Sequence, residues 1–72
     1  MTEIQISTEF IKLDQLLKFT GLCYDGAEAK QIIKEGCVSV NGEPELRRGR
    51  KLFKGDEIEI EAEDENILLK IV

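Results

Sequence analysis

The side chains of this sequence that could take part in chemistry fall into three groups: thiols, carboxylates and a basic run. The thiols, Cys23 and Cys37, are too far apart for a CxxC pair, and the chain has no histidine to complete a zinc site. We expect both thiols to be reduced and dispensable for binding a partner. Cys37 directly follows Gly36, which ends a predicted helix, and is expected to be the more buried. The sequence therefore predicts no metal site.

The carboxylates that lie closest together also fit a structural role. Glu57, Glu59 and Glu61 alternate with isoleucines, which is the pattern of a strand with one solvated face. The lack of histidine removes the commonest general base. No glycine-rich phosphate loop precedes a helix. We therefore expect a protein that is not an enzyme and needs no cofactor.

Basic side chains are concentrated in the middle of the chain, although the net charge of the 72 residues is −5. Residues 12–55 hold nine basic and six acidic residues, which gives +3, whereas residues 56–72 hold one basic and seven acidic residues, which gives −6. Charges more than about 10 Å apart are largely screened at ~0.1 M salt. The run RRGRK places four positive charges within five residues, where they repel one another. This basic middle favours an anionic partner over a merely solubilising loop.

Two helices are predicted to position part of this charge. Over residues 11–20 leucines recur at the spacing of one buried helical stripe. The second helix begins after Asp25, whose carboxylate can cap it, and ends at Gly36. At about 100° per residue, Lys30 and Lys34 fall together beside its apolar stripe. These two lysines are candidates for binding an anion, although a solvated helix face has the same pattern.

Strands are predicted on both sides of the helices, where apolar and polar residues alternate. The alternation covers residues 3–7, the inward-facing Val38 and Val40, residues 56–61 and residues 67–72. Asn41-Gly42 is the strongest short signal for a hairpin turn. This order predicts a single α+β domain over residues 1–72, with two helices packed on a small antiparallel sheet.

Three segments, in this order and at this spacing, resemble the RNA-binding domain of ribosomal small-subunit protein four, or alpha-L RNA-binding motif: KLDQLL, AKQIIKEGCVSVNG and RRGRKLFKGD. The resemblance covers about residues 10–60. It is strongest to the stand-alone bacterial subfamily of the YaaA/YbcJ type. It implies a helix pair whose basic surface and adjoining loop clasp folded RNA. Where many members have Ser-Arg at the start of the second helix, this sequence has Asp25-Gly26.

Carried over by position, the resemblance implies RNA contacts for seven basic side chains. They are Lys12, Lys30, Lys34, Arg47, Arg48, Arg50 and Lys51. Lysine and arginine suit this task because RNA duplexes hide their base edges and are recognised through phosphates and shape. The resemblance therefore implies a partner that is structured RNA, ribosomal or ribosome-associated. We expect a cytoplasmic protein, because no apolar run approaches the ~18–20 residues of a membrane span. We also expect a monomer.

Few aromatic side chains are expected to be free for stacking on bases. Tyr24 could stack on a base, but packing in the core or at its rim is the favoured interpretation. The apolar residues expected to lie in the core or to anchor the basic stretch are Phe10, Phe19, Leu46, Leu52 and Phe53. Since single-strand binders rely on exposed aromatic rings, the sequence favours folded RNA over unstructured RNA.

Two other classes of protein remain as alternatives. One is a protein-interaction module on the ribosome without direct RNA contact, which the acidic last third of the chain supports. The other is a sulfur carrier with a β-grasp fold, which shares the small size and the acidity. Such carriers need a Gly-Gly C-terminus, whereas this sequence ends Leu69-Lys70-Ile71-Val72, so this alternative is the weaker.

Overall fold

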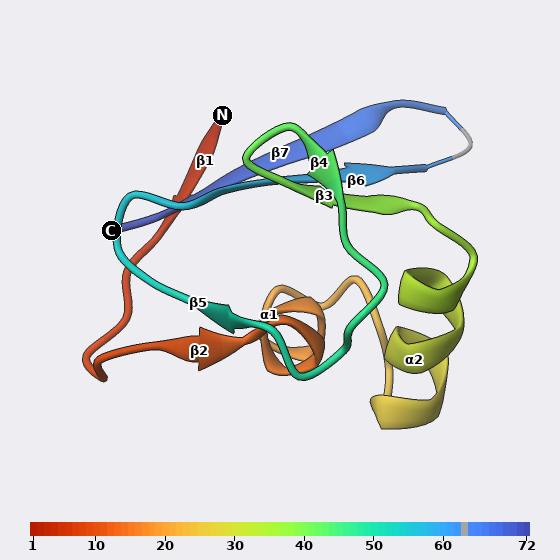
Figure 1. Cartoon of the computed structure of the whole chain (residues 1–72), viewed down its shortest axis with the longest axis horizontal. Coiled ribbons are helices and arrows are strands. Elements are labelled where there is room, and N and C mark those ends of the chain that lie inside the picture. The colour runs from red at the N-terminus through yellow and green to blue at the C-terminus, as the bar shows by residue number, and fades with distance from the viewer. Residues whose placement is uncertain (63) are drawn as a thin grey trace.

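The two helices form where apolar residues recur at helical spacing, and they lie under a sheet whose strands carry alternating apolar residues. The computed structural model describes residues 1–62 and 64–72, so residue 63 of the acidic segment lies outside it. The elements follow one another in the order β1 (Thr2–Ile4), β2 (Ile11–Lys12), α1 (Leu13–Phe19), α2 (Gly26–Lys34), β3 (Val38–Val40), β4 (Glu43–Pro44), β5 (Lys51–Leu52), β6 (Glu57–Glu61) and β7 (Asn66–Ile71). Figure 1 shows the large sheet above and the helices below.

The core lies between the helices and the inner face of the large sheet. The three leucines of α1 are fully buried, and α2 contributes Ala29 and Ile33. The sheet contributes the inward residues of β3, β6 and β7, which confirms the predicted alternation of Val38 with Val40. Each fully buried leucine or isoleucine favours folding by roughly 1.5–3 kcal/mol relative to an exposed one. This packing confirms the α+β prediction.

The strands form a five-stranded sheet in the order β1-β7-β6-β3-β4 and a separate two-stranded sheet of β2 and β5. All pairs are antiparallel except β1 with β7, which run parallel. The large sheet is therefore mixed, where an antiparallel one was predicted. Alternation reports which face a residue occupies but not the direction of a strand, and no hairpin joins the first strand to the last.

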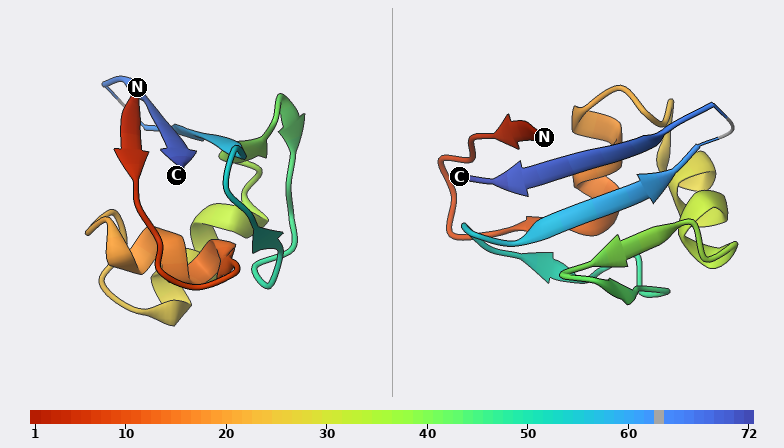
Figure 2. Two further views of the ribbon diagram at one scale, coloured as in Figure 1. Left: turned by 90° about the vertical axis from the view of Figure 1, so that its left-hand side faces the viewer. Right: turned by 90° about the horizontal axis from the view of Figure 1, so that it is seen from above.

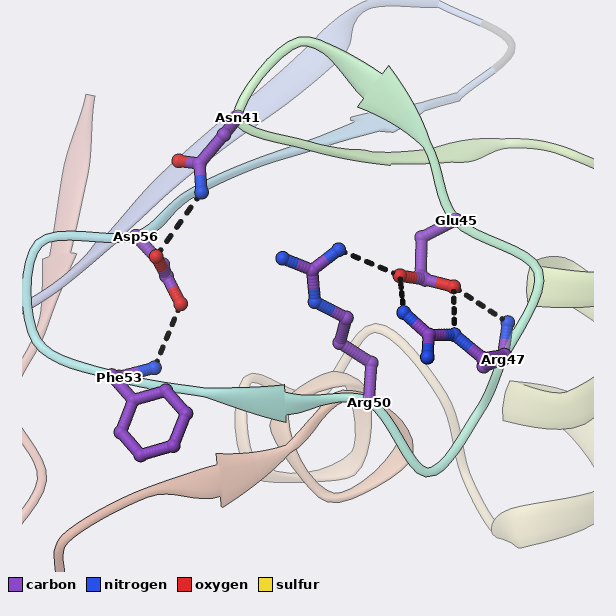
Figure 3. A network of polar contacts seen from close by, with 6 residues as sticks. All are labelled: Asn41, Glu45, Arg47, Arg50, Phe53 and Asp56. Atoms are coloured by element: carbon purple, nitrogen blue, oxygen red, sulfur yellow. Dashed lines mark hydrogen bonds and ion pairs between the residues drawn. The ribbon is translucent and has the colours of Figure 1, made fainter.

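The hairpin between β3 and β4 turns at Asn41-Gly42, as predicted. Both residues have positive φ, 52° and 86°, which a two-residue turn of type I′ requires. The Asn41 amide also donates to Asp56 Oδ1 at 3.1 Å and its oxygen accepts from the Glu57 N–H at 2.9 Å. Asp56 Oδ2 in turn accepts from the Phe53 N–H at 2.8 Å (Figure 3). These bonds hold the turn before β6 against the hairpin.

Some predicted boundaries differ from the structure. The helix predicted over residues 11–20 begins at Leu13, because the two preceding residues pair with β5 as strand β2. The first strand, predicted over residues 3–7, covers Thr2–Ile4 instead. The last two strands agree with the prediction to within one residue.

The prediction that most aromatic residues lie in the core is wrong. Phe19 is 68% exposed, Phe53 43% and Tyr24 94%. Leu46, a predicted anchor, is 64% exposed, whereas Leu52 is completely buried as predicted. Leucines, isoleucines and valines already fill the interior of this small domain, and a short chain keeps a large share of its surface exposed.

Both cysteines are free, but the order of their burial is the reverse of the prediction. Cys23 is 4% exposed, whereas Cys37 is half-buried. The N–H of Cys23 donates to the Leu17 carbonyl at 3.2 Å, which folds the segment after α1 back onto the core. Cys37 lies in the short link from α2 to β3.

Candidate nucleic-acid interface

The basic segment, residues 47–51, leads from β4 into the start of β5, and its backbone is fixed to the start of α1. The Leu13 N–H donates to the Arg50 carbonyl at 2.9 Å, and the Asp14 N–H donates to the Arg48 carbonyl at 3.0 Å. The first N–H groups of a helix have no partner within the helix itself. The carbonyls of the basic segment supply that partner, so the segment and the helix start form one unit.

Glu45, two residues before Arg47, binds two arginines of the basic segment. Its carboxylate is buried and accepts from the Arg47 N–H, from Arg47 Nε at 3.0 Å and from a terminal nitrogen of Arg50 at 2.8 Å (Figure 3). Hydrogen bonds from Arg47, followed by that from Arg50, lower the pKa of Glu45 to about 2. The same pairing raises the pKa of Arg47. Glu45 therefore carries a negative charge and fixes the direction of both guanidinium groups.

Sequence reasoning did not identify this role of Glu45. The signal in the sequence is one acidic residue two positions before a dense basic run, and an ordinary exposed turn residue would give the same pattern. The two ion pairs found among the described residues are those of Glu45 with Arg47 and Arg50. Arg47 keeps 74% of its side chain exposed, whereas Arg50 keeps 31%. The four charges of the run are therefore not equivalent.

Lys12 and Lys51 lie directly opposite each other in the small sheet, on β2 and β5. Both are exposed, as is Arg48. Lys51 Nζ also lies 4.8 Å from the centroid of the Phe10 ring. Together with the anchored segment, Lys12 completes a cluster of five basic side chains around the start of α1. Four residues of the segment, Arg47, Gly49, Arg50 and Lys51, line an open hollow of about 530 Å³.

Lys30 and Lys34 are exposed on α2, as predicted from the spacing. Figure 1 shows α2 and the segment that leads into β5 on the same side of the large sheet. Within the described residues, no hydrogen bond or ion pair connects either lysine to that segment. Asp25 is the N-cap of α2 and accepts from the Glu28 N–H at 3.0 Å, so the predicted cap is confirmed.

A comparison with models of protein families shows the family to which the chain belongs. The model of the S4 domain matches residues 4–69. The chain belongs to the S4 domain family. This confirms the resemblance to the RNA-binding domain of ribosomal small-subunit protein four, and the match extends beyond the predicted residues 10–60 at both ends.

A relative of this S4 domain from Bacillus subtilis (strain 168) is 50% identical over 58 residues. The matched region spans 81% of this chain and 82% of the relative, which is named "Probable ribosome maturation protein RlbA". In the described part of the S4 domain, no helix has the length and apolar character needed to cross a membrane.

Proposed function

We propose that this S4 domain binds structured, ribosome-related RNA without catalysing a reaction. The observation that carries the proposal is the basic segment anchored on α1. The carbonyls of Arg48 and Arg50 accept backbone hydrogen bonds from the helix start, while the Arg48 side chain is exposed and Glu45 orients the guanidinium group of Arg50. The name of the relative supports a role in ribosome maturation. We further propose that residues 1–72 act as a single RNA-binding domain and as a monomer in the cytoplasm.

The anchored segment suits phosphates held at fixed spacing. Arginine presents planar donors to phosphate oxygens, and lysine offers a mobile point charge. Because Glu45 already orients Arg47 and Arg50, less conformational freedom is lost when their remaining donors meet an anion. Arg48, Lys51 and Lys12 are exposed and add charge at the same end of α1, because their backbones pair with or adjoin the start of that helix. A folded RNA offers a rigid array of phosphates to such a surface, whereas a flexible strand must first be ordered.

The exposed flank of α2 extends the proposed interface. Lys30 and Lys34 lie one turn apart on a helix that packs against α1. Two lysines at this spacing can contact successive phosphates of one RNA strand. The proposed RNA-binding residues are therefore the seven of the sequence prediction: Lys12, Lys30, Lys34, Arg47, Arg48, Arg50 and Lys51.

Two charge-reversal variants test the two halves of the interface against a matched control. Lys30→Glu with Lys34→Glu tests α2, and Arg48→Glu with Lys51→Glu tests the segment. Lys18→Glu with Lys54→Glu changes the net charge equally at exposed lysines outside the proposed interface. Each test variant should weaken binding of a ribosomal RNA hairpin by about tenfold or more, since a hydrogen bond between charged groups contributes about 1.5–3 kcal/mol. The control variant should lose much less affinity for the hairpin.

Circular dichroism should show the native fold in all three variants, because every substituted side chain is exposed. Unchanged affinity of the Lys30/Lys34 variant would remove α2 from the interface. If both test variants bind as tightly as the control, the protein does not bind RNA through these residues. Binding of a ribosomal protein in place of RNA would then favour the interaction-module alternative.

A further inference from the structure

The two-stranded sheet of β2 and β5 has an outer face with an unusual composition. Leu52 is fully buried and pairs with the half-buried Ile11, so this pair faces the core. Side chains alternate between the two faces of a strand. Lys12 and Lys51, directly opposite each other, therefore point outward. Phe10 and Phe53 flank the two strands and lie on the same face, because Lys51 Nζ lies over the Phe10 ring and the two rings are neighbours. One small face thus presents two lysines and two aromatic rings.

The aromatic pair is held in place and remains accessible. The ring centroids of Phe10 and Phe53 lie 6.0 Å apart with the planes tilted by 51°. Phe53 is 43% exposed, and its backbone is fixed by the hydrogen bond from its N–H to Asp56 (Figure 3). Lys51 Nζ lies 4.8 Å from the centroid of the Phe10 ring, so one lysine already contacts the aromatic pair. A ring supported in this way loses little freedom when a flat partner stacks on it.

The lysine pair is unfavourable without an anion. Like charges directly opposite each other on paired strands destabilise a sheet, and Lys12 and Lys51 occupy such a position. Both are exposed, and the ion pairs among the described residues do not include them. A bound phosphate would relieve this repulsion. A nucleotide combines the two groups that this face accommodates, a flat base and a phosphate.

We propose that the outer face of the β2–β5 sheet binds one unpaired nucleotide of the RNA, with its base stacked on Phe53 and a phosphate held by Lys12 and Lys51. This proposal rests on the proposed function and narrows it. The basic segment adjoins β5 directly, so the unpaired nucleotide lies next to the duplex that the segment grips. The preferred RNA is a stem with an adjoining unpaired base, at a bulge or a junction, rather than a blunt hairpin.

A fluorescent base at the unpaired position tests the stacking directly. The probe is an RNA hairpin with a single 2-aminopurine bulged from its stem, compared with the same stem without the bulge. The wild-type protein should change the 2-aminopurine fluorescence and bind the bulged hairpin more tightly. Phe53→Ala should abolish the fluorescence change and weaken binding of the bulged hairpin by about fivefold or more, as for loss of one stacked base. Binding of the blunt hairpin should not change.

Three further variants separate stacking from a loss of structure. Phe53→Leu keeps an apolar side chain against Phe10 but has no ring. It should lose the fluorescence change and bind the bulged hairpin more weakly, as Phe53→Ala does. Phe53→Tyr keeps the ring and should restore the fluorescence change. Phe19→Ala removes another exposed phenylalanine, at the opposite end of α1, and should behave as wild type. Thermal unfolding of each variant reports whether the fold is intact.

The outcomes distinguish the two proposals. If the bulged and blunt hairpins bind equally tightly and Phe53→Leu changes neither affinity, this inference is wrong although the proposed RNA binding stands. If neither hairpin binds at low salt, both proposals are wrong. If Phe19→Ala abolishes the fluorescence change as Phe53→Ala does, the base does not stack at this face, and the inference is again overturned.

Discussion

Pairing with Glu45 makes the basic side chains of RRGRK differ from one another in orientation and exposure. The carboxylate is buried and accepts hydrogen bonds from two arginines that the sequence presents as equal members of RRGRK. Buried carboxylates are costly unless they are paired, so Glu45 and its arginines stabilise one arrangement of the segment. The residue therefore acts on the proposed interface through Arg47 and Arg50 rather than by touching RNA.

The first prediction concerns the pH dependence of this pairing. The pKa of Glu45 is lowered from 4.5 to about 2, so its contribution to the free energy of unfolding is complete above about pH 5 and is lost as the pH falls towards 2. Glu45→Gln should lower the free energy of unfolding at pH 7 by on the order of 1–3 kcal/mol, from lost hydrogen bonds to a charged group. Urea unfolding of both proteins at several pH values measures this. The difference between them should shrink below pH 5, and a difference independent of pH would contradict the assignment.

The second prediction concerns the two thiols. Burial, followed by the charges of Glu28 and Asp25, raises the pKa of Cys23, and the thiolate is the form that reacts. Cys37 is only half-buried, so iodoacetamide should modify Cys37 before Cys23 in the native protein. Peptide mass spectrometry of briefly treated protein gives the order. Earlier modification of Cys23, or an intramolecular disulfide in the native protein, would contradict the structure.

At the scale of the elements, the start of α2 has an acidic cap. The Asp25 side chain accepts from the Glu28 N–H, which removes one unpaired donor at the start of the helix. The acidic cap also stabilises the helix through its dipole. The same charge disfavours a phosphate placed at this end of α2, so stability and RNA affinity respond differently to its removal.

The third prediction follows from these opposite effects of Asp25 on helix stability and on RNA affinity. Asp25→Ala should lower the free energy of unfolding by about 1 kcal/mol, because the cap is lost. Asp25→Ser should stay within a few tenths of a kcal/mol of wild type, since serine caps nearly as well. Both variants should bind RNA at least as tightly as wild type. Thermal unfolding and RNA titration of the pair test this, and weaker binding by the serine variant would show that Asp25 itself contacts the RNA.

The features predicted correctly from the sequence are those encoded by a few adjacent residues. The Asn41-Gly42 turn, the Asp25 cap and the helix stop at Gly36 each depend on local backbone preferences. The α+β class followed from the order of such signals. The site residues remain predictions, because exposure and clustering of basic side chains do not by themselves identify a contact with RNA.

The features that were missed depend on contacts between distant segments. The parallel pairing of β1 with β7 joins the two ends of the chain. The two-residue strands β2 and β5 are too short to show an alternation of apolar and polar residues in the sequence. The outward position of Phe53 follows from that pairing, since only the register with β2 determines which face it occupies. Burial of Glu45 likewise requires the fold to bring the segment against α1.

At the scale of the whole molecule, the glutamates of β6 and the basic cluster lie on different sides. The glutamates of β6 point to the outer face of the large sheet, because Ile58 and Ile60 fill its inner face. Seen from above, the strands lie in front of the helices, and no other described element covers that face (Figure 2). The basic cluster lies instead around the start of α1. In the proposed function, this separation lets a protein of net charge −5 attract RNA in one orientation and repel it in others.

The measurement that tests this account most directly is a competition titration of an RNA hairpin against an unstructured RNA of equal length, at two salt concentrations. The account predicts tighter binding of the hairpin, because the anchored basic cluster fits phosphates held at fixed spacing. It also predicts that affinity falls steeply as salt rises, since each neutralised phosphate releases counterions. Equal affinity for the two RNAs, or affinity that does not change with salt, would show that the basic cluster is only a solvated surface.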